Sequence, residues 1–155
     1  MIILGIDPGT ASTGYGVIKK SRTFRCLDYN VIHTKPNSEP GERLRKINNR
    51  LSQVIREHQP DVLAIENIYF FKNLKTAIPV SEAKGAILLT AAKKKLPVCE
   101  FTPLQVKLAI TGNGRADKKE VQKKLKKILK LKQIPKPDDA ADALAIAMTY
   151  FIKEV

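Results

Sequence analysis

The stretch Ile2-Ile3-Leu4-Gly5-Ile6-Asp7, followed by Pro8-Gly9, decides the fold of this chain. Its short apolar, β-branched run ends at an acid and a turn signal, which predicts a buried strand over residues 2–7. Residues 62–66 read the same way, as an apolar strand closed by Glu66. Ligands of α/β sheets bind at the carboxyl ends of the strands. If these two strands are parallel neighbours, Asp7 and Glu66 emerge at one edge of the sheet.

The rest of the chain alternates between strand-like and helix-like patterns. Residues 15–20 and 23–35 show partial period-two alternation across a short polar connection, which predicts a hairpin. Helical periodicity begins near Gly41. Capping boxes open two later helices, at Thr102 and at Asp117. The other expected elements are helices at about 73–95 and 139–153 and a strand at 96–102. The order βββαβαβααα predicts an α/β domain, with a mixed sheet flanked by helices.

Length and charge narrow the class of protein. A chain of 155 residues is long enough for one domain with a proper core, which we expect to span residues 1–155. Lys and Arg number 28 against 15 Asp and Glu, a formal charge of +13 that favours nucleic acid over an anionic membrane as the partner. No leader is visible, and no run approaches the ~18 apolar residues of a membrane span. We therefore expect a cytoplasmic protein without a membrane partner.

Two further acids stand at the start of the last predicted helix. Asp139 and Asp142 are three residues apart, so they share one helical face. Asp138 before them is the expected N-cap. Asp142 lies within the small, apolar run 140–147, which should pack against the sheet. An aspartate in such a face needs a partner.

Electrostatics indicate what that partner is. Two carboxylates ~4 Å apart repel by about 4 kcal/mol at an effective dielectric constant of ~20. Several acids at one place would therefore take up protons unless a cation joins them. Oxygen ligands without His or Cys favour Mg²⁺, or Mn²⁺ as a substitute. Two such ions roughly 4 Å apart could activate water and neutralise a leaving 3′ oxygen, which is the chemistry of phosphodiester hydrolysis.

Basic and aromatic side chains near the acids are candidates for DNA contact. Lys107, Lys118 and Lys119 stand near predicted helix starts, where they could bind phosphates. Arg115 opens the segment 115–136, which has ten basic residues and two acids; a solvated lysine face explains that segment equally well. Directly after the Glu66 strand comes a run that could stack on or wedge between bases, Tyr69-Phe70-Phe71-Lys72.

Ordered motifs over essentially the whole chain resemble the RuvC family of bacterial Holliday junction resolvases, within the RNase H-like superfamily. The matching residues are Gly5-Ile6-Asp7-Pro8-Gly9, Thr13-Gly14-Tyr15-Gly16-Val17, Ala64-Ile65-Glu66, Ala83-Lys84-Gly85, Thr102-Pro103, Val106-Lys107, Thr111-Gly112, Ala116-Asp117-Lys118 and Asp139-Ala140-Ala141-Asp142-Ala143-Leu144-Ala145.

The resemblance implies a five-stranded mixed sheet and a Mg²⁺-dependent homodimer that makes paired, symmetric nicks in four-way DNA junctions. The products would have 5′-phosphate and 3′-hydroxyl ends, and the RuvA–RuvB branch-migration complex would be a partner. The helix at 73–95 would form the dimer interface. Tyr69 falls where the family commonly has a phenylalanine that contacts the opened junction, and Lys107 and Lys118 match its functional lysines. The positions that match its catalytic, metal-binding acids are Asp7, Glu66, Asp139 and Asp142.

Two other functions remain open at this stage. An RNase H-type ribonuclease that cuts RNA in RNA–DNA hybrids would have the same fold and acids. A non-catalytic DNA-binding scaffold would use the acids as helix caps and core pairs. Cleavage assays separate the three hypotheses.

Overall fold

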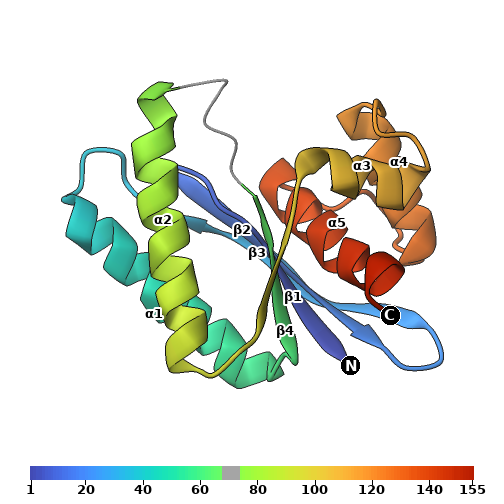
Figure 1. The fold of residues 1–155 in the computed structure, drawn as a ribbon, viewed down its shortest axis with the longest axis horizontal. Helices are drawn as coiled ribbons and strands as arrows, with labels where there is room; N and C mark the ends of the chain where they lie inside the picture. The colour runs from blue at the N-terminus through green and yellow to red at the C-terminus, as the bar shows by residue number, and fades with distance from the viewer. Residues whose placement is uncertain (68–73) are drawn as a thin grey trace.

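The computed structural model describes residues 1–67 and 74–155 of the chain, and within them it contains five strands and five helices (Figure 1). The strands are β1 (Ile2–Asp7), β2 (Ser12–Lys20), β3 (Phe24–His33), β4 (Val62–Glu66) and β5 (Val98–Phe101). The helices are α1 (Pro40–His58), α2 (Leu74–Lys93), α3 (Pro103–Thr111), α4 (Lys118–Ile128) and α5 (Asp138–Lys153).

The five strands form one mixed sheet in the order β3-β2-β1-β4-β5. β1, β2 and β3 pair antiparallel, whereas β1 with β4 and β4 with β5 pair parallel. The predicted mixed sheet flanked by helices is thus confirmed. β1 and β4 are parallel neighbours, which is the condition under which the sequence places Asp7 and Glu66 at the same edge.

Helices cover both faces of the sheet, α1 and α2 on one side and α5 with α3 and α4 on the other (Figure 1). Strand alternation decides which side chain meets which layer. In β1, Ile3 packs in the core next to α5, while Leu4 and Ile6 pack in the core next to α1 and α2. Gly5 and Asp7 lie on the same face of β1 as Ile3, so the side chain of Asp7 faces α5.

Glycines let α5 lie directly on the sheet. A Cβ at Gly5 would overlap the carbonyl oxygen of Ala143, and one at Gly14 would overlap that of Asp139. Gly16 leaves room in the same way for the side chain of Leu144. Because these glycines have no side chain, the backbone of α5 approaches the strands closely at Gly5 and Gly14. This contact fixes the height of α5 above the carboxyl end of β1.

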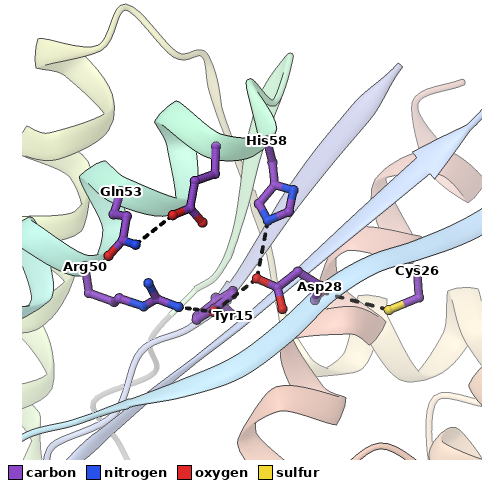
Figure 2. Close-up of polar contacts among 7 residues, drawn as sticks. Tyr15, Cys26, Asp28, Arg50, Gln53 and His58 are labelled. Carbon is purple, nitrogen blue, oxygen red and sulfur yellow. Dashed lines mark hydrogen bonds and ion pairs between the residues drawn. The ribbon is translucent and has the colours of Figure 1, made fainter.

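The opposite layer is held by polar side chains as well as by apolar packing. The hydroxyl of the buried Tyr15 accepts a hydrogen bond from Arg50 Nη2 (2.9 Å) and donates one to Asp28 Oδ2 (3.2 Å), which also lies 3.3 Å from His58 Nε2 (Figure 2). Figure 2 shows Arg50 and His58 reaching from α1 toward β2 and β3. These bonds fix α1 against the hairpin.

α1 also contacts α2 through a hydrogen bond. The side chain of Asn48 donates from Nδ2 to Thr90 Oγ1 at 2.7 Å, and Thr90 is buried. Among the described residues, no helix is long and apolar enough to cross a membrane.

The structure corrects two local predictions. β2 begins at Ser12 rather than at residue 15, because Ser12, Thr13 and Gly14 pair with β3 and Gly14 also pairs with β1. Gly14 is a weak strand former, so the local pattern does not show this pairing. Asp138 is not the N-cap of α5. Pro137 takes that position without a side-chain cap, and Asp138 instead accepts a hydrogen bond from Gln122. Both predicted capping boxes are confirmed, at Thr102 with Gln105 and at Asp117 with Glu120.

Candidate active site

Asp7 and Glu66 end the two central parallel strands. The last pair in the register of β1 and β4 is Ile6 with Ile65, so the next residues along both strands are the two acids. Glu66 alternates along β4 with Val62 and Ala64, so its side chain lies on the same face of the sheet as theirs. Val62 and Ala64 pack in the core on the α5 side. Both carboxylates therefore face α5.

α5 supplies the other two predicted acids. Its first turn lies against β2 at Gly14, the residue that pairs with Asp7. Carboxylate oxygens of Asp7, Asp139 and Asp142, all half-buried, lie within 4.8 Å of one another. Glu66 lies outside that group of three but faces a cavity of about 260 Å³ together with Asp142. The structure thus gathers all four predicted acids at one edge of the sheet.

Burial and mutual repulsion raise the pKa of three of these acids, Asp7, Glu66 and Asp142. Burial, then the neighbouring charges of Glu66, Asp142 and Asp139, raises the pKa of Asp7 to about 8. Burial also raises the pKa of Glu66, with a further contribution from Asp142. For Asp142, burial raises the pKa although the ammonium of Lys118 opposes the shift. The site has more negative charge than the protein neutralises.

Lys118 forms an ion pair with Asp142. Its Nζ lies 3.0 Å from Asp142 Oδ2 and 3.5 Å from Asp138 Oδ2. Burial lowers the pKa of Lys118, but the hydrogen bond to Asp142 and the nearby carboxylates outweigh burial and raise it. Lys107 of α3 lines the same cavity as Lys118 and Glu66. Two of the predicted basic residues therefore stand beside the acids.

Ser12 is a member of the site that sequence reasoning missed. Its Oγ donates to Asp139 Oδ2 at 2.6 Å, across 127 residues of chain. Ser12 shares the parity of Gly14 and Gly16, so it faces α5 from the start of β2. No local pattern signals this contact, because it depends on where α5 docks.

The loop between β1 and β2 is tied to α1. The hydroxyl of Thr34 and the guanidinium of Arg43 both donate hydrogen bonds to the carbonyl oxygen of Thr10. The backbone amide of Thr34 donates a hydrogen bond to the carbonyl oxygen of Ala11 at 2.8 Å. Arg43 Nε also donates to Thr34 Oγ1 at 3.4 Å. This loop joins Asp7 to Ser12, so α1 helps to fix two residues of the site.

Other predicted DNA-contact residues either do not line this cavity or fall outside the described residues. Arg115 and Lys119 are exposed at the start of α4 and do not line the cavity beside Glu66. Tyr69, Phe70 and Lys72 fall within residues 68–73, outside the described residues.

The acids fit a divalent metal. Their donors are carboxylate oxygens only, the set that hard cations such as Mg²⁺ prefer. The raised pKa of Asp7 reflects buried negative charge that a cation would compensate. Asp7, Asp139 and Asp142 would be ligands, with Glu66 beside them.

A mixed sheet of this order, with acids at the ends of its central parallel strands and on a helix across them, defines the RNase H-like class of nucleases. The family model described as crossover junction endodeoxyribonuclease RuvC matches residues 3–150. The chain therefore belongs to the RuvC family.

Individual relatives are similar over nearly their full length. Crossover junction endodeoxyribonuclease RuvC of Petrotoga mobilis is 50% identical over 151 residues, covering 97% of this chain and 93% of the relative. The Thermus thermophilus RuvC structure is 37% identical with a TM-score of 0.92, covering 99% of this chain and 95% of that chain. The structure of T. thermophilus RuvC in complex with Holliday junction substrate is also 37% identical, with a TM-score of 0.93. This match covers 99% of this chain and 94% of that chain.

Proposed function

We propose that this chain is an endonuclease that resolves four-way DNA junctions by paired, symmetric phosphodiester cleavage during recombination and repair. The observation that carries the proposal is the group of carboxylates at the ends of β1 and β4, on a fold that a RuvC bound to Holliday junction substrate shares. The whole chain, residues 1–155, would act as one nuclease domain in the compartment that holds the chromosome, the cytoplasm.

Four acids would bind the metal ions beside the reacting phosphate. Asp7, Asp139 and Asp142 would hold the ions, and Glu66 would complete the site from β4. Ser12 orients Asp139 through its hydrogen bond. Lys118 and Lys107 border the same cavity, where their charges would bind scissile or neighbouring phosphates.

The metal we propose is Mg²⁺, with Mn²⁺ as a substitute and two ions in each site. When bound, such ions lower the pKa of an attacking water and neutralise charge on the leaving 3′ oxygen, which leaves 5′-phosphate and 3′-hydroxyl ends.

Paired cleavage requires two sites with two-fold geometry, which a homodimer supplies. We propose that α2 forms its interface, because Leu74, Ile78 and Leu89 are 80%, 69% and 54% exposed on that helix. A groove between α1 and α2, of about 490 Å³, is lined in part by Gly85, Ala86 and Leu89, and small residues would admit a close partner. The RuvA–RuvB branch-migration complex is the expected further partner.

Cleavage of three substrates tests the proposal. With Mg²⁺, the wild-type protein should cut a synthetic four-way junction in preference to a linear duplex or an RNA–DNA hybrid. Preferential hybrid cleavage would instead support the RNase H-type alternative. Junction binding without cleavage, in Mg²⁺ and in Mn²⁺, would support the scaffold.

Substitution of the acids assigns the chemistry to the site. Asp7→Asn and Glu66→Gln should abolish cleavage, while junction binding persists or tightens because negative charge beside phosphate is removed. Glu154→Gln is the matched control. This exposed acid lies at the C-terminal end of α5, whereas Asp139 and Asp142 lie at its start, so the substitution should leave cleavage unchanged.

A further inference from the structure

A basic groove lies along α1, outside the carboxylate site. It has a volume of about 550 Å³. We call it the α1 groove, and it is lined by Thr34, Lys35, Ser38, Glu42, Arg43, Arg45, Lys46, Asn49, Arg50 and Gln53.

The charge of the groove is strongly positive. Five cationic side chains face a single acid, Glu42, which pairs with Arg45 at 2.5 Å. Arg43 and Arg50 donate hydrogen bonds to uncharged oxygens, the carbonyl of Thr10 and the hydroxyl of Tyr15, so these contacts do not neutralise the positive charge of the groove. Lys35 and Lys46 are exposed, and within the described part of the chain neither forms an ion pair. The groove therefore has an excess of positive charge that suits an anionic ligand.

The groove begins beside the carboxylate site. His33 at the end of β3 pairs with Ser12, so the segment after β3 leaves the sheet at the edge where β1 ends (Figure 1). Thr34 and Arg43 both hold the carbonyl of Thr10. Thr10 lies three residues after Asp7, a distance of at most about 11 Å along the chain. One strand of a duplex carries a charge about every 3.4 Å of helix axis, so Thr10, which Thr34 and Arg43 of the groove contact, lies within a few nucleotides' span of the reacting phosphate.

The chemistry of the lining distinguishes the possible occupants. Protein interfaces bury a core of aromatic or aliphatic anchors, and membrane-binding surfaces insert apolar side chains. None of the described residues that line the groove is apolar. Cations together with hydroxyl and amide groups, such as Ser38 and Asn49, are the set that binds a sugar–phosphate backbone.

We propose that the α1 groove is a second DNA-binding site, which holds the phosphate backbone of the junction arm next to the cleavage point. This inference rests on the proposed function, because it assumes junction DNA as the substrate. Lys35 and Lys46 bind phosphates as point charges, so the groove positions the arm without reading its sequence.

The test removes the two free charges and measures the salt dependence of binding. Lys35→Gln with Lys46→Gln keeps side-chain length and removes two cations. Junction affinity of the full-length protein is measured without divalent metal over a range of salt concentrations, so the result does not depend on cleavage. At ~0.9 per phosphate contact on duplex DNA, the slope of log affinity against log salt should fall by about 1.8 for each protomer that engages an arm.

The matched control removes two cations at the opposite end of the sheet. Lys19→Gln with Arg22→Gln changes the charge equally, but Lys19 pairs with Ile2 at the start of β1 and both residues are exposed. The control slope should stay near the wild-type value, and unchanged circular dichroism should show that both variants fold.

Shortening the arms locates the contact. A junction whose arms are too short to reach α1 should bind the wild type and the groove variant equally. If the groove variant keeps the wild-type slope on long arms, or loses no more than the control, the α1 groove does not bind DNA. A wild-type protein that binds no junction at all would overturn the proposed function and this inference together, whereas an unchanged groove variant overturns this inference alone.

Discussion

At the scale of single residues, the site is built from acids and from the groups that orient them. The carboxylate of Asp139 has two oxygens, and one of them, Oδ2, accepts a hydrogen bond from the hydroxyl of Ser12 at 2.6 Å. A hydrogen bond of this kind limits the rotation of a metal-binding carboxylate. Ser12 therefore orients Asp139, which we propose as a metal ligand.

Ser12→Ala should weaken metal binding. Loss of a partner that orients a metal ligand typically costs 10–100-fold in metal affinity, roughly the effect we expect here. Ser12→Thr keeps the hydroxyl and should retain near wild-type affinity. Mn²⁺ titration followed by electron paramagnetic resonance measures binding apart from cleavage. Equal affinities of the Ala variant and the wild type would show that Ser12 has no role in the site.

Asp7 should make the stability of the metal-free protein depend on pH. Burial, followed by the charge of Glu66, raises its pKa from the ordinary 3.8 to about 8. The folded state thus holds the proton more tightly than the unfolded state does. Stability that protonation provides below about pH 4 is then lost as the pH rises toward about 8, and levels off above it.

Thermal unfolding across that pH range measures the effect. The Tm of the metal-free wild type should fall with rising pH, and Asp7→Asn should reduce this fall. Mg²⁺ needs the ionised carboxylate, so its stabilising effect should grow with pH over the same range. A metal-free Tm that rises from about pH 5 to about pH 8 would contradict the assignment.

At the scale of elements, the approach of α5 to the sheet decides whether the acids meet. Gly14 faces the backbone of Asp139, and no side chain stands between them. Main-chain atoms cannot rotate away as side chains do. A methyl group at this position must therefore displace the helix or strain the strand.

Gly14→Ala should destabilise the protein and weaken metal binding together. Overpacking costs typically about 1–3 kcal/mol, and a shift of α5 would move Asp139 relative to Asp7. Urea denaturation and Mn²⁺ titration measure the two effects. Gly41→Ala is the control, because nothing lies within 4 Å of a Cβ there. Alanine at that helical position should be neutral or stabilising by up to about 1 kcal/mol.

These elements also mark how far sequence reasoning reaches. The apolar runs that end in Asp7 and Glu66 predict two strands closed by acids, whereas the parallel pairing of β1 with β4, which brings the two acids to one edge, is visible only in the structure. Ser12 could not be predicted, because its bond to Asp139 forms only after α5 docks on the sheet. Asp138 was wrongly predicted as an N-cap, since cap propensity is local whereas Gln122 and Lys118 reach it through tertiary packing.

At the scale of the whole molecule, an apolar surface of α2 is exposed within the described part of the chain. α2 buries Ala83 and Ile87 against the sheet while Ile78 and Leu89 are exposed. Exposed apolar groups of this size on one element mark an interaction surface. The two-fold symmetry of the proposed reaction indicates a second copy of the chain.

Leu89→Glu should shift the protein from dimer to monomer, because a charge at a tightly packed interface would lose its hydration. Sedimentation velocity measures the change. On a junction, the monomeric variant should make single, uncoupled nicks rather than paired cuts. Ile152→Glu is the control, as this side chain is 45% exposed at the far end of α5. A wild type that sediments as a monomer while it makes paired cuts would contradict the dimer.

Helix α1 has a consequence for how this protein could be altered. One rigid rod lines the groove proposed for DNA, holds Thr10 through Arg43, and meets α2 through Asn48. One helix makes all three contacts. A chimera that exchanges residues 40–58 for those of a distant relative would therefore change the groove, the contact with Thr10 and the contact with α2 at once. Changes to substrate preference are therefore best made one side chain at a time on the solvent side of this helix, where Lys46 and Asn49 are exposed and the inner contacts stay intact.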